Sequence, residues 1–279
     1  MIEEGGATIV ERAPAKLNLA LHVRRRRPDG YHDIETLFAF CRDGDVISFT
    51  PAQSDSFAIF GPFGVALAGE GDNLVTRARD LFRATFAVSE RCAIVLEKNL
   101  PVASGIGGGS ADAAATLRAL ARRHDVAGDD PRLFELAGRL GADVPACLMG
   151  RSAIGYARGD DLRPVADMAG KPVVLINPGA AVSTAQVFAG WDGEDRGAIG
   201  GGDPSRDRND LTAAAMAVAP VIATVLDVLE RQPGAGLVRM SGSGATCFAL
   251  FDTANAARIA AEAIASQHPD WWLLETSLV

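Results

Sequence analysis

Residues 101–115 read PVASGIGGGSADAAA and place a glycine-rich loop directly before a run of helix-forming residues. The loop contains four glycines: Gly105, Gly107, Gly108 and Gly109. Glycine lacks a Cβ, so the backbone N–H groups of such a loop can approach a ligand closely. The helix expected from Ser110 to Arg123 begins with N–H groups that have no intrahelical partner, and its N-terminal end carries a partial positive charge. This combination is a candidate phosphate-binding loop.

A flexible linker before an ordinary helix is the alternative for this stretch. Pro101 and Ser110 bound the glycines, and the strand-like segment 92–100, CAIVLEKNL, precedes them, which favours the phosphate loop. The loop is not of the G-x-x-x-x-G-K-[ST] type, because no Lys follows its last glycine. It also departs from the dinucleotide-binding pattern, because Ser110 stands where the third glycine belongs.

The composition is that of a chain with one large or two modest hydrophobic cores, because 48% of its 279 residues are hydrophobic. No run of about 18 apolar residues occurs, so we expect no membrane span. Residues 1–12 are acidic and lack the apolar segment of a signal peptide, so we expect a cytoplasmic protein. The cysteines are far apart and form no C-x-x-C, which predicts buried free thiols.

The net charge of −8 argues against non-specific nucleic-acid binding, which needs a basic surface. It leaves room for an anionic ligand, because a local site can be positive on an acidic protein. Lysine is rare in this chain and occurs only at Lys16, Lys98 and Lys171. For Lys98, just before the glycines, a solvated strand end and a binding role remain open.

Residues 7–23 predict two strands that are broken near Pro14. From Lys16 onward apolar and other residues alternate, which puts Lys16 and Asn18 on one strand face. A solvated polar face is the alternative to a functional one. A basic run and a Pro-Asp-Gly turn follow, and Tyr31 opens the next strand, with a second hairpin expected at 43–45.

Several later segments carry clear helix and strand signals. Asp72-Asn73 predicts an N-cap for a helix to Phe86, and Asp130-Pro131 starts another helix. Asp143 is either the cap of the short turn 144–148 or a functional carboxylate. The remaining expectations are a strand at 171–179, a mobile loop at 190–209, helices from Asp210 broken at Pro220, two strands joined by a Gly-Ser-Gly turn within 238–251, a helix at 254–267 and a closing strand.

Strands and helices alternate irregularly, which predicts an α+β fold. We place a boundary between residues 162 and 170, which gives domains 1–162 and 163–279.

The pattern P-x-x-x-G-I-G-G-G-S-A-D-A-A resembles the phosphate loop of the GHMP kinases, a family of small-molecule kinases. PAKLNLAL at 14–21 and MSGSGA at 240–245 resemble two further motifs of this family, so the resemblance covers nearly the whole chain. It implies a two-domain GHMP kinase fold with an N-terminal ATP-binding domain, a C-terminal domain and the active site in the cleft between them.

The form G-G-G-S-A-D-A-A is most similar to a branch of the family that serves isoprenoid precursor synthesis. This implies transfer of the ATP γ-phosphoryl group to the 2-hydroxyl of a cytidine diphosphate-linked polyol. Mg²⁺ is expected with ATP, but the sequence shows no clear protein ligand for the metal, and Ser110 is only a candidate. We expect no nucleic-acid or membrane partner, and a monomer or weak homodimer.

The resemblance also implies roles for individual residues. Asp143 takes the hydroxyl proton, and Lys16 orients Asp143 and stabilises developing charge. Tyr31 stacks on the cytosine and His32 hydrogen-bonds its edge. The residues expected to bind ATP are Pro101, Gly105, Gly107, Gly108, Gly109, Ser110, Ala111, Asn73 and Lys98. Those expected to bind the acceptor are Asn18, Tyr31, His32, Val182 and Thr184.

Two alternatives remain. Another GHMP small-molecule kinase would keep the glycine loop without needing Tyr31 and His32. A catalytically silent, ligand-sensing member of the fold would bind without turnover, although intact Lys16 and Asp143 argue against it.

Overall fold

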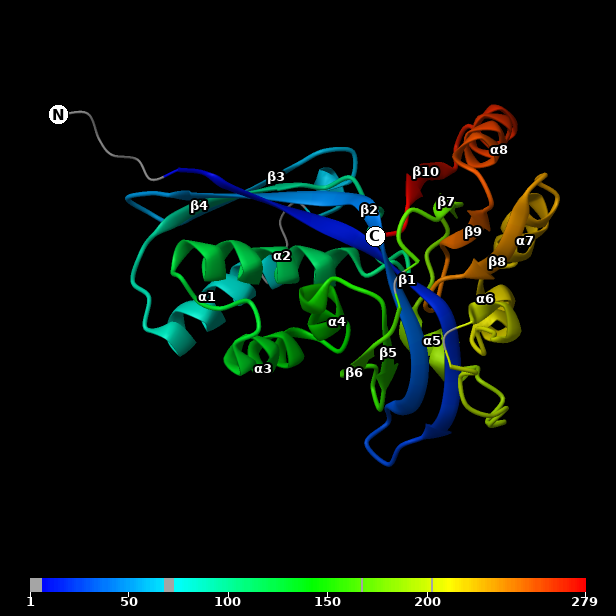
Figure 1. Ribbon diagram of the computed structural model, residues 1–279, viewed down its shortest axis with the longest axis horizontal. Helices are drawn as coiled ribbons and strands as arrows, with labels where there is room; N and C mark the ends of the chain where they lie inside the picture. The colour runs from blue at the N-terminus through cyan, green and yellow to red at the C-terminus, as the bar shows by residue number, and fades with distance from the viewer. Residues whose placement is uncertain (1–6, 68–72, 167, 202) are drawn as a thin grey trace. The chain divides into compact units, whose positions relative to one another are not determined.

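The computed structural model describes residues 7–67, 73–166, 168–201 and 203–279 (Figure 1). Two expectations fall partly outside these residues: the character of the N-terminus at 1–6, and Asp72 of the predicted helix cap. Backbone contacts divide the chain into two units. The first unit comprises Met1–Ala15, Asp43–Val102 and Gly108–Gly150; the second comprises Lys16–Arg42, Ala103–Gly107 and Arg151–Val279. The glycine-rich loop therefore passes from the second unit into the first at the Gly107–Gly108 peptide.

The first unit combines a sheet with a group of helices. Strand β4 (Cys92–Glu97) pairs antiparallel with the C-terminal part of β2 (His32–Pro51), and β3 (Ser56–Phe60) pairs with β4 in parallel. A 3₁₀ turn, η1 (Gly64–Leu67), follows β3. The helices gather on one side of this sheet (Figure 1): α1 (Leu74–Phe86), α2 (Gly108–Arg123), α3 (Pro131–Leu140) and α4 (Val144–Met149).

The second unit contains a four-stranded antiparallel sheet in the order β10-β7-β9-β8, with helices α7 and α8 packed on it (Figure 1). Its strands are β7 (Pro172–Asn177), β8 (Ala235–Met240), β9 (Cys247–Phe251) and β10 (Trp272–Ser277). Its helices are α5 (Thr184–Ala189), η2 (Pro204–Arg206), α6 (Thr212–Val218), α7 (Val221–Glu230) and α8 (Ala254–Gln267). The N-terminal part of β2 pairs with β5 (Ala153–Tyr156), and β5 pairs with β6 (Asp161–Pro164).

Most of the predicted elements are confirmed. The helix after Asn73 ends at Phe86, the helix after Asp130 is α3, the pair broken at Pro220 is α6 and α7, and α8 covers 254–267 as expected. The helix predicted over 110–123 is α2, which begins at Gly108, two residues before the predicted start. All four cysteines are buried, and none of them forms a disulfide bond, as predicted.

The predicted strand break at Pro14 is wrong, because β1 runs without interruption over Ile9–Arg26. Within the described sheets β1 has β2 as its strand partner. Proline is tolerated in such an edge strand, because its missing N–H need not face a neighbouring strand.

The predicted hairpin at 43–45 is also wrong, because β2 continues through these residues. Gly44 makes no turn there. A Cβ on Gly44 would lie 2.1 Å from the carbonyl oxygen of Ala13, so glycine permits two chain segments to pass closely.

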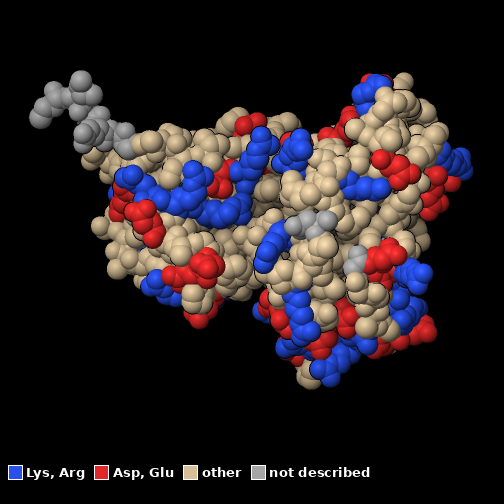
Figure 2. All heavy atoms as spheres, in the orientation of Figure 1, with Lys and Arg blue, Asp and Glu red and all other residues tan. Residues whose placement is uncertain are grey.

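The division at 162–170 stays a prediction, because the two contact units interleave along the chain and residue 167 is not described. None of the helices in the described ranges is long and apolar enough to cross a membrane. On the face shown in Figure 2, basic and acidic side chains lie interspersed in small groups.

Candidate active site

The first part of the glycine-rich loop is held by the turn between β8 and β9. Gly105 has a φ of 80°, and a Cβ there would lie 2.5 Å from the carbonyl oxygen of Ser241 and 2.7 Å from that of Gly244. Ser241 Oγ donates to the carbonyl oxygen of Gly105 at 3.0 Å, and Thr246 N donates to that of Ser104 at 3.1 Å. Both the backbone angle and the close approach therefore require glycine at position 105.

Lys16 lies against this loop. Its backbone N–H donates to the carbonyl oxygen of Ile106 at 2.9 Å, and a Cβ on Gly107 would come within 2.9 Å of Lys16 Cε. The Lys16 side chain is 3% exposed, and Nζ donates to Asn18 Oδ1 at 2.9 Å. The alternative of a solvated polar face on this strand is wrong.

Asn18 connects Lys16 to the turn. Its backbone N–H donates to Ser241 Oγ at 3.1 Å, and its Nδ2 donates to Thr36 Oγ1 at 2.7 Å. Because Lys16 donates to its oxygen and Thr36 accepts from its nitrogen, the orientation of the Asn18 amide is fixed. The two predicted residues of this strand thus lie in one buried hydrogen-bond network with the loop.

In the first unit, the start of α2 lies over a buried lysine. Lys98 is 2% exposed, and its Nζ lies 2.6 Å from both Asp45 Oδ2 and Asp112 Oδ2. A Cβ on Gly108 would be 3.1 Å from Lys98 Nζ. The alternative of a solvated strand-end lysine is therefore wrong. Its ammonium contacts two carboxylates, so a nucleotide role for Lys98 stays a prediction.

Sequence reasoning missed Asp45 and Asp112. Asp45 Oδ1 also accepts from the backbone N–H groups of Asn99 and Leu100 at 2.6 and 2.8 Å, so this carboxylate fixes the strand end before the loop. Asp112 Oδ1 is buried and has no hydrogen-bond partner among the described residues. The available signal was an acidic residue among alanines on a buried helix.

The buried triad changes the proton affinities of its members. Burial raises the pKa of the Asp112 carboxyl to about 8, although the Lys98 charge opposes the shift. Burial lowers the pKa of the Lys98 ammonium, but the charges of Asp112 and Asp45 outweigh burial and leave that pKa raised. A protonated Asp112 would make the triad neutral overall.

Asp143 precedes α4, but its side chain makes no capping hydrogen bond to that helix. Asn73 and Asp130 do cap their helices, by accepting from Val75 N and Arg132 N respectively. Capping is therefore not what Asp143 contributes, and its catalytic role stays a prediction. Among the other residues predicted to bind ATP, Pro101 and Ala111 are buried and Ser110 is half-buried.

The predicted base-reading residues differ in exposure. Tyr31 is 59% exposed, with the guanidinium of Arg158 5.8 Å from its ring centre. His32 is buried; its ring centre is 5.0 Å from that of Phe188 and 5.7 Å, edge to face, from that of Trp191. Sequence reasoning missed both aromatic residues: Phe188 lies in the last turn of α5, and Trp191 follows the helix.

The remaining predicted acceptor residues lie at the start of α5. Ser183 caps the helix through Gln186 N, and Thr184 Oγ1 lies 2.9 Å from Ser243 Oγ of the β8–β9 turn. Val182 is part of the hydrophobic core of its unit, so its side chain faces the core. Any contact of Val182 with an acceptor stays a prediction.

No group of three or more His, Cys, Asp or Glu side chains is arranged to hold a metal ion in the part of the chain that the structure describes. Mg²⁺ keeps several waters and binds substrate phosphates with few protein ligands, and the half-buried Ser110 near the start of α2 carries one hydroxyl oxygen that could serve as such a ligand.

Two family models match this chain. The one described as the GHMP kinases N terminal domain matches residues 73–151, and the one described as GHMP kinases C terminal matches residues 195–270. The match to the N-terminal model includes the glycine-rich loop and Asp143.

Individual relatives match over nearly the whole length. The chain is 52% identical to a 4-diphosphocytidyl-2-C-methyl-D-erythritol kinase of Rhizorhabdus wittichii, covering 96% of this chain and 94% of the relative. It is 48% identical to that of Novosphingobium aromaticivorans, covering 96% and 92%.

A crystal structure of 4-(cytidine 5'-diphospho)-2C-methyl-D-erythritol kinase matches with a TM-score of 0.81 and 35% identity, covering 97% of this chain and 99% of that one. The chain therefore belongs to the GHMP kinases, a family of ATP-dependent phosphotransferases, and within them to the 4-diphosphocytidyl-2-C-methyl-D-erythritol kinase family.

Proposed function

We propose that this enzyme transfers the γ-phosphoryl group of ATP to the 2-hydroxyl of 4-diphosphocytidyl-2-C-methyl-D-erythritol, in the non-mevalonate route to isoprenoid precursors. The full-length likeness to kinases that carry this substrate in their names supports the proposal. The structural observation that carries it is the glycine loop, braced by Ser241 and bordered by Lys16 and Asn18.

The loop and the start of α2 bind the triphosphate through backbone N–H groups. Gly105 and Gly107 take positive φ values and have no side chains of their own, which lets phosphate oxygens approach the backbone at these positions. Asn73 caps α1 by accepting from Val75 N, and it also contributes to nucleotide binding. Lys98 contributes indirectly: its ammonium contacts Asp112 near the start of α2 and Asp45, and so fixes the start of the helix.

Asp143 is the general base. The 2-hydroxyl oxygen forms a bond to the γ-phosphorus, the bond from that phosphorus to the β,γ-bridging oxygen breaks, ADP leaves and the hydroxyl proton passes to Asp143. Such a base contributes about 10²–10⁴-fold to rate. Lys16 supplies an ammonium to developing negative charge, and Asn18 fixes its position.

The cytosine is read by Tyr31 and His32. An exposed Tyr ring offers a stacking face. Burial lowers the pKa of His32, and the Arg26 charge lowers it further, so the imidazole is neutral near neutral pH. Arg26 Nε donates to His32 Nε2 at 3.4 Å, which puts the ring proton on Nδ1. Phe188 adds an aromatic face beside His32. Val182 and Thr184 contribute to binding of the substrate that accepts the phosphoryl group.

Mg²⁺ accompanies ATP and, when bound, neutralises phosphate charge; the Ser110 hydroxyl is the candidate protein ligand. We further propose domains 1–162 and 163–279, a monomer or weak homodimer, and a cytoplasmic location.

An ADP-release assay with the purified enzyme tests this function. We expect ATP-dependent turnover with 4-diphosphocytidyl-2-C-methyl-D-erythritol and little with homoserine or mevalonate. Turnover with another alcohol only would identify a different GHMP kinase, and ATP binding without any turnover would identify a silent member of the fold.

A further inference from the structure

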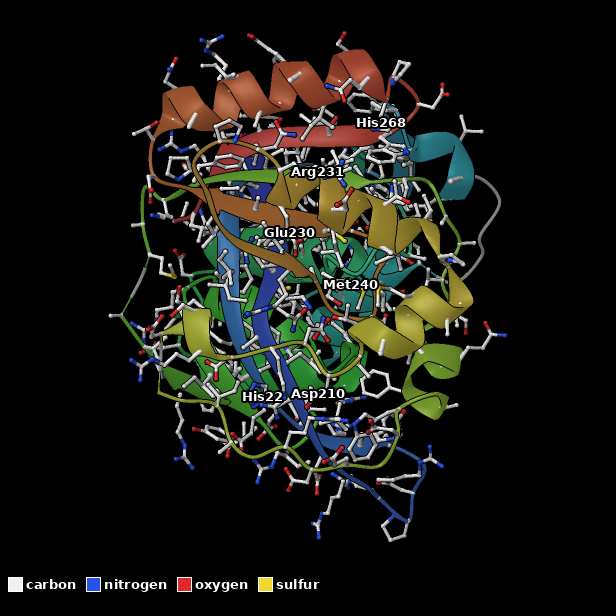
Figure 3. All side chains as sticks on the ribbon, turned by 90° about the vertical axis from the view of Figure 1, so that its right-hand side faces the viewer. His22, Asp210, Glu230, Arg231, Met240 and His268 are labelled. Atoms are coloured by element: carbon white, nitrogen blue, oxygen red, sulfur yellow. The ribbon has the colours of Figure 1, made fainter. Side chains whose placement is uncertain are left out.

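Residues 208–210, at the end of the long 190–209 loop, form backbone hydrogen bonds with the edge of β1. Leu21 N donates to the carbonyl oxygen of Arg208 at 2.8 Å, and Asp210 N donates to that of Leu21 at 2.9 Å. Val23 N donates to Asp210 Oδ2 at 2.8 Å. In Figure 3, Asp210 accordingly lies beside His22 of β1. These bonds fix the backbone on both sides of Asn209.

The side chain of Asn209 reaches the turn between β8 and β9. Its Nδ2 donates to the carbonyl oxygens of Met240 and Gly242, both at 2.8 Å, and its Oδ1 accepts from Leu211 N at 3.0 Å. Asn209 is 7% exposed. Both amide hydrogens are therefore used inside the protein, on the last carbonyl group of β8 and on one carbonyl group of the turn that follows.

This turn is the one that braces the glycine loop. A Cβ on Gly242 would lie 2.8 Å from the carbonyl oxygen of Gly105 and 3.3 Å from Asn18 Oδ1. Ser241 Oγ donates to Gly105 and accepts from Asn18 N. The turn thus contacts the loop and Asn18 through Ser241 and Gly242, and Gly242 also accepts from the Asn209 amide.

The turn also has hydrogen bonds of its own, from Ser241 N to Thr246 O and from Gly244 N to Ser241 O. These bonds set the shape of the turn but do not tie Gly242 to any neighbouring segment. The bonds from Asn209 do so, and only a side chain with two donors on one atom at this distance can serve both carbonyls.

We propose that Asn209 is a positioning residue for phosphoryl transfer: its amide holds the 241–244 turn against the 103–107 loop, which fixes that loop for the nucleotide phosphates. This inference rests on the proposed function only in the phosphate-binding role of the loop. Asn209 touches no reacting atom and acts through the turn.

The test compares N209D with wild type. A carboxylate has the same shape but no donor, and it would face two carbonyl oxygens at short distance. Its protonated form can donate to one of them, so acidification restores part of the contact. We expect the Kd of an ATP analogue, measured by calorimetry, to rise about tenfold near pH 8 and only about threefold near pH 6, with kcat reduced in parallel.

N255D is the matched control, because Asn255 is exposed on α8, and it should behave as wild type. N209S supplies a second variant, impaired at both pH values, and thermal unfolding shows whether each variant is folded. Kd and kcat of N209D within twofold of N255D would overturn the proposal. So would loss of folding in both Asn209 variants, because that result would assign Asn209 to general stability. If the wild type binds ATP but does not turn over the cytidyl substrate, the proposed function fails while the Kd comparison still decides the role of Asn209.

Discussion

At the scale of single residues, the triad of Asp45, Lys98 and Asp112 places two carboxylates and one ammonium in a buried site. Asp45 has further hydrogen bonds from Asn99 and Leu100, whereas one oxygen of Asp112 has none among the described residues. Burying an unmatched charge is costly. Burial raises the pKa of the Asp112 carboxyl and so favours its protonated form, which would relieve the excess negative charge.

Replacing Asp112 by Asn tests this protonation. The ordinary Asp pKa is about 3.9 in an unfolded chain, and in the folded protein burial raises it to about 8. Between these values unfolding releases a proton, so this group makes the protein less stable as pH rises. D112N lacks the titration, so its free energy of unfolding should rise relative to wild type by up to about 1.4 kcal/mol per pH unit in that window.

Urea unfolding at several pH values between about 5 and about 8 measures the difference. D252N, which alters an exposed carboxylate paired with Lys171, provides the baseline for an Asp-to-Asn change. Parallel stability curves for D112N and wild type would show that Asp112 stays ionised beside Lys98.

Asp143 is the second residue with a single-substitution test. D143N preserves shape but cannot accept a proton, so we expect kcat to fall by at least about 10²-fold with little change in ligand affinity. Thermal unfolding of D143N separates a loss of catalysis from a loss of folding. D130N, which alters a carboxylate that does cap its helix, should retain turnover. Activity of D143N within a few-fold of wild type would place the base elsewhere.

At the scale of elements, the loop and the turn require glycine at position 105. G105A would put a methyl group within 2.5 Å of one backbone carbonyl oxygen and 2.7 Å of another, at a φ of 80°. These neighbours are backbone atoms, which can move only at a substantial cost in free energy. We therefore expect the loop to shift and nucleotide affinity, measured by calorimetry, to fall at least about tenfold.

Gly138 is the matched control, because nothing lies within 4 Å of a Cβ at this position inside α3. G138A should raise stability by about 0.5–1 kcal/mol and leave kcat unchanged. Unchanged nucleotide affinity in folded G105A would contradict the phosphate-binding role of the loop.

The elements with local signals could be predicted from the sequence. Capping residues such as Asn73 and Asp130 and the break at Pro220 define helices within a few residues of their position. Pro14 and Gly44 misled the prediction, because their meaning depends on which strand or backbone passes beside them. The same limit applied to the site: Lys16 and Asn18 could be identified from their motif, but Asp45, Asp112 and Asn209 act through contacts distant in sequence.

At the scale of the whole molecule, the acceptor distinguishes this kinase from its relatives, because the glycine loop and Asp143 could serve any alcohol. We propose that only the group around His32 selects a cytidyl compound, and His32 is held there by Arg26 and flanked by Phe188. Cytosine N3 is a hydrogen-bond acceptor where uracil carries an N3–H donor. Because Arg26 donates to His32 Nε2, the Nδ1–H of His32 can pair with cytosine N3 but meets a second donor when uracil binds, which leaves a buried polar group unpaired.

The uridine analogue of the acceptor should therefore be a poor substrate. An unpaired buried polar group costs about 1–3 kcal/mol, so we expect kcat/KM for the uridine compound to be lower by about 5- to 150-fold. H32A should reduce this preference while nucleotide affinity stays close to wild type, because His32 lies outside the glycine loop. H268A is a matched control, since His268 stacks on Trp271 after α8. It should keep the preference, whereas equal kcat/KM for the two compounds in the wild type would exclude base reading and favour a kinase for a different alcohol.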